Sequence, residues 1–127
     1  MNISKQIIKK EGNIARNKAP LIFGNCDYIA REFSKQLIDK YEIDGSDIRL
    51  LVVNVKKDNK NYTDGHTIVY IKDKFYIELS LDQFNNTNKD YNAITFGNKE
   101  NIKGIQIFTS SDKNISHYEI KNELPLR

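Results

Sequence analysis

The sequence predicts an α+β fold in which helices come first and an antiparallel sheet follows. In the early part of the chain, apolar residues recur at helical spacing. The remainder consists of short β-branched and apolar runs separated by polar turns. This order of elements is typical of α+β domains. Because 127 residues fit one core, we expect a single domain spanning 1–127.

The composition fits a folded domain and disfavours a nucleic-acid partner. Hydrophobic residues make up 39% of the chain, and seven Tyr and six Phe supply material for a modest core. The net charge of +3 arises from 20 basic and 17 acidic residues, and the basic ones are scattered along the chain. A scattered, mild excess of basic residues indicates a solvated surface and not a basic nucleic-acid footprint.

The numbers and positions of cysteine and histidine limit which disulfides and metal sites the chain can form. A single cysteine excludes an internal disulfide and a Cys-based metal cluster, and acids and histidines do not occur at ligand spacing. We therefore expect no metal and no cofactor. There is no apolar run long enough to span a membrane and no signal-peptide core, which predicts a soluble domain whose export signal, if any, lies elsewhere.

Two helices are expected before the sheet. Residues 1–20 form the first, a short amphipathic helix or arm that Gly12 weakens and Pro20 ends. The second runs from Cys26 to about Tyr41, with Asn25 as N-cap and an acid in its first turn. Its predicted core stripe is Cys26, Ile29, Ala30, Phe33, Leu37 and Ile38, and its predicted outer face is Arg31, Glu32, Lys35, Gln36 and Asp39.

Strands are expected through the rest of the chain. Residues 48–55 form the first, and 66–71 and 75–80 form a hairpin around a short charged turn. Residues 56–65 are predicted to be a long polar loop that could act as a lid beside His66. Further strands fall within 92–121, and the alternation in GIQIFTS predicts that it is a central strand.

Cys26 is the first candidate for chemistry. A thiol reacts as its thiolate, which the unpaired N–H groups and dipole of a helix N-terminus favour. The same N–H groups could later hold an oxyanion. Taken alone, Cys26 fits better as a small apolar residue on a packed helix stripe.

His66 and Glu78 are the second and third candidates. His66 opens one strand of the hairpin, and Glu78 lies on the next strand, facing the same side as Tyr76. The hairpin brings Glu78 within a residue or two of His66, where an acid would orient the imidazole and stabilise its charged form. Asp82 is the competing acid, although it lies beyond the strand. A nucleophile, a base and an orienting acid placed this way predict a thiol hydrolase.

Three segments, GNCDYIAREF, GHTIVYI and FYIELSLDQF, carry a resemblance to a known family. They resemble papain-fold, transglutaminase-like cysteine enzymes, above all the small toxin domains at the C-termini of bacterial polymorphic and contact-dependent inhibition toxins. That family has a Cys at a helix start, a His beginning a strand, then an acid, a small hydroxyl residue and Gln-Phe. Here Gln83-Phe84 completes the motif, and Glu-Leu-Ser stands where the family usually has Asp-Pro-Thr.

The resemblance covers residues 24–84, the expected core of the site. It implies a papain-like fold, with the Cys-bearing helix packed on an antiparallel sheet. It also implies a Cys26-His66-Glu78 triad that hydrolyses or transfers an amide, as a glutamine deamidase, protease or transglutaminase. The family's usual side chain for the oxyanion lies a few residues before the Cys and has no counterpart here, so Asn25 or backbone N–H groups would serve, with Asn17 more distant.

The same resemblance implies a biological setting. The domain would be secreted or delivered as part of a larger bacterial toxin and would act on a protein in the cytoplasm of the target cell. An immunity protein would cover its active site.

Two other functions remain open. One is a small, basic, metal-independent ribonuclease toxin that uses His66 and His117 as its acid-base pair. Its phosphate contacts would come from lysines, the candidates being Lys56, Lys57, Lys103 and Lys121. The other is a non-enzymatic module that binds a protein partner by strand addition.

Overall fold

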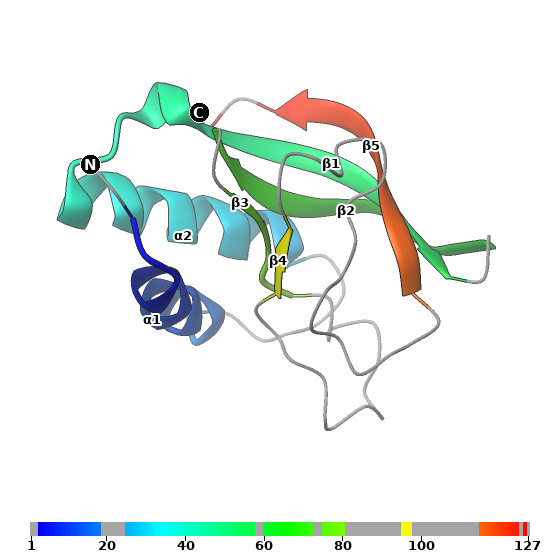
Figure 1. Cartoon of the computed structure of the whole chain (residues 1–127), viewed down its shortest axis with the longest axis horizontal. Coiled ribbons are helices and arrows are strands. Elements are labelled where there is room, and N and C mark those ends of the chain that lie inside the picture. The colour runs from blue at the N-terminus through cyan, green and yellow to red at the C-terminus, as the bar shows by residue number, and fades with distance from the viewer. Residues whose placement is uncertain are drawn as a thin grey trace.

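The computed structural model describes residues 3–18, 25–57, 60–72, 75–80, 95–97, 115–124 and 126. Over these residues the fold is α+β, as predicted, with two helices followed by an antiparallel sheet (Figure 1). The elements are α1 (Lys5–Arg16), α2 (Cys26–Tyr41), the 3-10 turn η1 (Gly45–Asp47), β1 (Ile48–Lys57), β2 (Lys60–Ile71), β3 (Phe75–Glu78), β4 (Thr95–Gly97) and β5 (Ile115–Leu124).

The described sheet has the strand order β4-β3-β2-β1-β5, and every neighbouring pair is antiparallel. The chain thus runs back and forth from β1 to β4, and β5 returns to the far side of β1. The predicted hairpin 66–71/75–80 is present as β2 and β3. The predicted central strand GIQIFTS lies outside the described residues.

The helix α2 has the predicted bounds. Its N-cap is Asn25, whose carbonyl accepts a hydrogen bond from the N–H of Ile29 at 3.0 Å. The Asn25 side chain does not make the predicted capping bond, because its backbone is not in the extended conformation that aims a side chain at the first turn. Asp27 lies in the first turn and pairs with Arg31 at 2.8 Å, and the helix ends at Glu42, whose φ is 55°.

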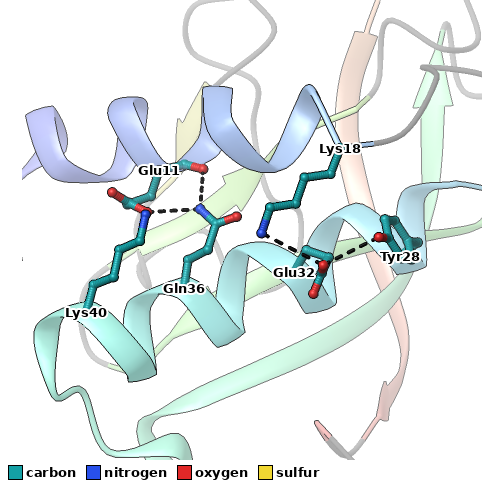
Figure 2. A network of polar contacts seen from close by, with 6 residues as sticks. All are labelled: Glu11, Lys18, Tyr28, Glu32, Gln36 and Lys40. Carbon is teal, nitrogen blue, oxygen red and sulfur yellow. Dashed lines mark hydrogen bonds and ion pairs between the residues drawn. The ribbon is translucent and has the colours of Figure 1, made fainter.

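The helix α1 docks on α2 through a buried carboxylate, that of Glu11 (Figure 2). Gln36 donates a hydrogen bond to the Glu11 backbone carbonyl and another to its carboxylate, both at 2.9 Å. Lys40 and Tyr41 each approach the carboxylate at 3.0 Å. The prediction that Gln36 faces solvent is therefore wrong, because the interior of this interface is polar and needs a donor there.

A second polar contact links the same pair of helices near the start of α2. Glu32 lies 3.8 Å from Lys18 and accepts a hydrogen bond from the Tyr28 hydroxyl at 3.4 Å (Figure 2). Arg16, at the end of α1, also donates a hydrogen bond to the backbone carbonyl of Leu79, just beyond β3. The N-terminal helix is therefore attached both to α2 and to the sheet.

The apolar core lies between the helices and one face of the sheet. Strand pairing places Leu50, Val69 and Ile77 on that face, since paired residues share a side of the sheet. The helices contribute Ile8, Ala15, Ile29, Ala30, Phe33 and Leu37 to the same cluster. Within the part of the chain described, no helix is long and apolar enough to cross a membrane.

The predicted polar loop at 56–65 is wrong. β1 continues to Lys57 and β2 begins at Lys60, so the described residues of this stretch belong to two paired strands. Pairing between antiparallel strands uses backbone groups, which polar residues supply as well as apolar ones do. The loop reading, and with it the lid beside His66, followed from side-chain polarity alone.

Candidate functional site

The three residues singled out from the sequence come together in the structure. Cys26 is the first residue of α2, His66 lies in β2, and Glu78 is the last residue of β3. Their exposed fractions are only 9%, 1% and 2%. Three chemically reactive side chains are thus withdrawn from solvent beside the N-terminus of a helix.

The register of the β2–β3 hairpin positions His66 against Glu78. Val69 pairs with Ile77, so strand alternation puts His66 and Glu78 together on the other face of the sheet. The Nε2 atom of His66 lies 2.8 Å from each oxygen of the Glu78 carboxylate. This contact confirms the prediction that the hairpin brings the two residues within reach of each other.

A β-bulge immediately precedes His66. Val53 pairs with His66, and Val55 pairs with Thr63, so two residues of β2 lie opposite Asn54 alone. One of the two is Gly65, whose φ of 70° falls in the left-handed region. Bulges bend a strand and redirect the side chains that follow, so this one sets the direction of His66.

Asn54 stabilises the bulge from the neighbouring strand. Its side chain is 6% exposed, and its Oδ1 accepts a hydrogen bond from the N–H of Gly65 at 3.4 Å. The bulge therefore has its own polar support directly before the histidine.

The charge state of His66 follows from its two neighbours. Burial by itself lowers the pKa of the imidazole, but the Glu78 carboxylate, together with hydrogen bonding and charge from Cys26, outweighs burial and raises the pKa to about 9. At neutral pH the ring is therefore an imidazolium placed between a thiol and a carboxylate.

Cys26 differs from the rest of the stripe on α2. Ile29, Phe33 and Leu37 belong to the apolar core cluster, whereas Cys26 is buried outside that cluster and interacts with His66. Cys26 is therefore buried on the helix stripe, as the alternative reading expects, and it also interacts with His66.

Two groups at the site were missed by the sequence reasoning. The hydroxyl of Tyr118, in β5, donates to Glu78 Oε1 at 2.6 Å, and the backbone N–H of Ser80 donates to Oε2 at 2.9 Å. Tyr118 lies 40 positions after Glu78, and no motif connects the two. The Ser80 contact uses its backbone N–H, which any residue except proline supplies, so the serine itself is not a signal for it.

The other predicted site residues either occupy known places in the fold or lie outside the part of the chain described. Asp82 and Gln83 lie outside the described residues, and Asn25 is at the N-cap of α2. Asn17 is the C-cap of α1. The backbone of His117 pairs with Lys56 on β1.

The described residues include no candidate metal-binding cluster, and they form a groove apart from Cys26 and His66. In the described ranges, no group of three or more His, Cys, Asp or Glu side chains could hold a metal ion. A groove of about 780 Å³ runs between the outer face of α2 and η1, away from Cys26 and His66. Arg31, Lys35, Glu32 and Asp39 on its wall give it mixed charge. Comparison with protein-family models, curated proteins and solved structures gives no match.

Proposed function

We propose that this chain is a cysteine-dependent amide hydrolase of papain-like architecture, with Cys26 as nucleophile, His66 as proton carrier and Glu78 as orienting acid. The observation that carries the proposal is the buried His66 ring, which interacts with Cys26 and lies 2.8 Å from both oxygens of the Glu78 carboxylate. A thiol paired with an imidazolium beside a helix N-terminus has the environment that activates cysteine nucleophiles.

The chemistry begins with the thiolate. Glu78 occupies Nε2 of His66. The proposed mechanism therefore assigns the other ring nitrogen, Nδ1, to the Cys26 sulfur. The sulfur attacks the amide carbon, and the C–N bond breaks as His66 transfers its proton to the departing amine or ammonia. A thioester on Cys26 remains.

Water completes the cycle. Neutral His66 removes a proton from the water that attacks the thioester, and the carboxylic acid and the Cys26 thiol are released. The backbone N–H groups of the first turn of α2 are the donors available for the oxyanion at both stages. Glu78 keeps its negative charge throughout and stabilises the imidazolium whenever it forms.

The substrate and setting are part of the same proposal. A domain of this kind would act on a protein glutamine or peptide bond inside a target bacterium, after delivery as part of a larger toxin, and would be neutralised by an immunity protein. The resemblance of the three motif segments supports this setting.

The test combines a chemical assay with matched variants. Purified protein is incubated with a bacterial lysate, and released ammonia and glutamine-to-glutamate conversion are measured by mass spectrometry. Cys26→Ala, or iodoacetamide treatment, should abolish both signals. Ser34→Ala is the control, because Ser34 is also small, 1% exposed and on α2, and it bonds only within its helix in the structure described.

The contrary outcome is equally concrete. Full amide hydrolysis after complete alkylation of Cys26 would contradict the mechanism. RNA cleavage that survives Cys26→Ala but not His117→Ala would instead favour the ribonuclease reading.

A further inference from the structure

We propose that Tyr118 is a positioning residue that holds the Glu78 carboxylate against the His66 ring. Strand β5 would thus supply one residue of the site. The catalytic meaning of Tyr118 rests on the proposed function, but its effect on His66 does not. The proposal assigns a role to the last strand of the chain, which lies far from the motif segments in sequence.

Every described contact of the Glu78 carboxylate supports this arrangement. Oε1 accepts from Tyr118 at 2.6 Å and lies 2.8 Å from His66 Nε2, while Oε2 accepts from the Ser80 N–H at 2.9 Å and lies at the same distance from Nε2. Each oxygen therefore has one contact to the imidazole and one to another donor. Such a carboxylate cannot rotate about its terminal bond without losing a hydrogen bond.

The Tyr118 contact does not follow from strand pairing. Two strands, β1 and β2, separate β5 from β3 in the sheet. Val53 pairs with His66 on one side and with Ile120 on the other, which places Tyr118 on the face that carries His66. Tyr118 and Glu78 thus meet by reaching across that face from opposite sides.

Burial makes this hydrogen bond significant. Tyr118 is 1% exposed and Glu78 is 2% exposed, so water does not readily replace the hydroxyl if it is removed. The O–H···O distance is in the short range typical of bonds to an ionised acceptor. Tyr118 therefore both stabilises the charge on Glu78 and fixes the direction of its oxygens.

The experiment is Tyr118→Phe, which keeps the ring and removes only the hydroxyl. The readouts are the titration of the His66 ring, followed by NMR, and the pH dependence of Cys26 alkylation by iodoacetamide. Among the described residues, the titratable side chains that act on His66 are Glu78 and Cys26, and both are retained. We expect the His66 midpoint to fall by about one pH unit, and the alkaline limb of the alkylation profile to shift by the same amount.

Tyr76→Phe is the matched control. Tyr76 is also a buried tyrosine, 2% exposed, and lies on the same face two residues before Glu78. Its ring stacks on Tyr70, with centroids 4.6 Å apart. This variant should leave both readouts unchanged, whereas a folded Tyr118→Phe protein that behaves like wild type would overturn the proposal.

A second variant keeps the test decisive if Tyr118→Phe does not fold. Incorporation of 3-fluorotyrosine at position 118 retains the ring and hydroxyl but makes the hydroxyl a stronger donor, which holds the ionised Glu78 carboxylate more firmly against His66 and raises the His66 midpoint. An unchanged midpoint overturns the proposal.

Neither readout needs a substrate. A shifted midpoint without any amide hydrolysis by the wild type would reject the proposed function and retain the role of Tyr118. If the wild type hydrolyses amides through Cys26 but Tyr118→Phe leaves the His66 midpoint unshifted, the proposed function stands and the role of Tyr118 is rejected.

Discussion

Gln36 of α2 donates two hydrogen bonds to Glu11 of α1, one to the backbone carbonyl and one to the carboxylate. The two residues lie 25 positions apart, and both are buried at the helix interface. The docking of the first helix therefore depends on a specific polar pair as well as on apolar packing.

Replacing Gln36 with Ala should destabilise the protein by about 1–3 kcal/mol, because buried acceptors on Glu11 lose one of their donors. Urea unfolding followed by circular dichroism measures the change. Asp39→Ala, on the exposed side of the same helix, should change stability by less than about 0.5 kcal/mol. Equal effects from the two variants would contradict the role given to Gln36.

Acid should weaken the same interface. Burial raises the pKa of Glu11, but hydrogen bonds from Lys40, Gln36 and Tyr41 outweigh it, so the pKa lies below its ordinary value of 4.5. A depressed carboxyl pKa gives stability that is present above the unfolded-state value and is lost as pH falls through the folded-state value. The stability difference between wild type and Glu11→Gln should therefore shrink as pH is lowered from 6 to 3, as measured by urea unfolding. A difference that grows would contradict this assignment.

Alkaline pH should weaken the site itself. The pKa of His66 is raised from 6.5 to about 9, so its protonation stabilises the fold fully below pH 6.5, and this contribution is lost as pH rises through 9. The loss amounts to about 3 kcal/mol at most. Wild type should lose more stability than His66→Gln between pH 6 and 10 in urea unfolding. Parallel curves for the two proteins would argue against a buried imidazolium.

The bulge before His66 should depend on its glycine. At Gly65 an added Cβ meets no atom within 4 Å, so the cost of Gly65→Ala is that of the left-handed backbone, about 1–2 kcal/mol. Gly65→Asn should cost less, because Asn tolerates this conformation better. Thermal unfolding measures both, with Cys26 alkylation as a second readout because His66 follows the bulge.

Gly45→Ala is the control for that experiment. An added Cβ there meets Ile38 at 3.5 Å and Leu126 at 3.9 Å, which are ordinary contacts, and its φ is not in the left-handed region. We expect little loss or a small gain in stability. A greater loss at Gly45 than at Gly65 would show that backbone conformation is not what the bulge requires.

The sequence pattern predicted those elements whose structure depends on residues close together in the chain. The apolar stripe gave the bounds of α2, and the short charged turn gave the β2–β3 hairpin, including the contact between His66 and Glu78. The outer part of the β1–β2 hairpin was missed because its backbone pairing leaves no apolar signature. Gln36 was misplaced because its burial depends on Glu11, in another helix.

In the candidate site, too, local contacts could be predicted from the sequence and long-range contacts could not. Its acid could be located from strand alternation within one hairpin, whereas Tyr118 reaches Glu78 across two intervening strands. A contact of that kind depends on the curvature of the whole sheet, which the spacing of residues along the chain does not encode.

The hydrogen bond from Arg16 to the Leu79 carbonyl joins the end of α1 to the residue directly after Glu78. Leu79 lies between the acid and Ser80, whose N–H also holds that acid. Removing α1 would thus loosen the peptide segment that carries the Glu78 carboxylate, even though the removed residues include neither Cys26, His66 nor Glu78. An assay of isolated fragments that begin at Cys26 would report a weakened protein, and the intact N-terminal helix belongs in any preparation meant to measure activity.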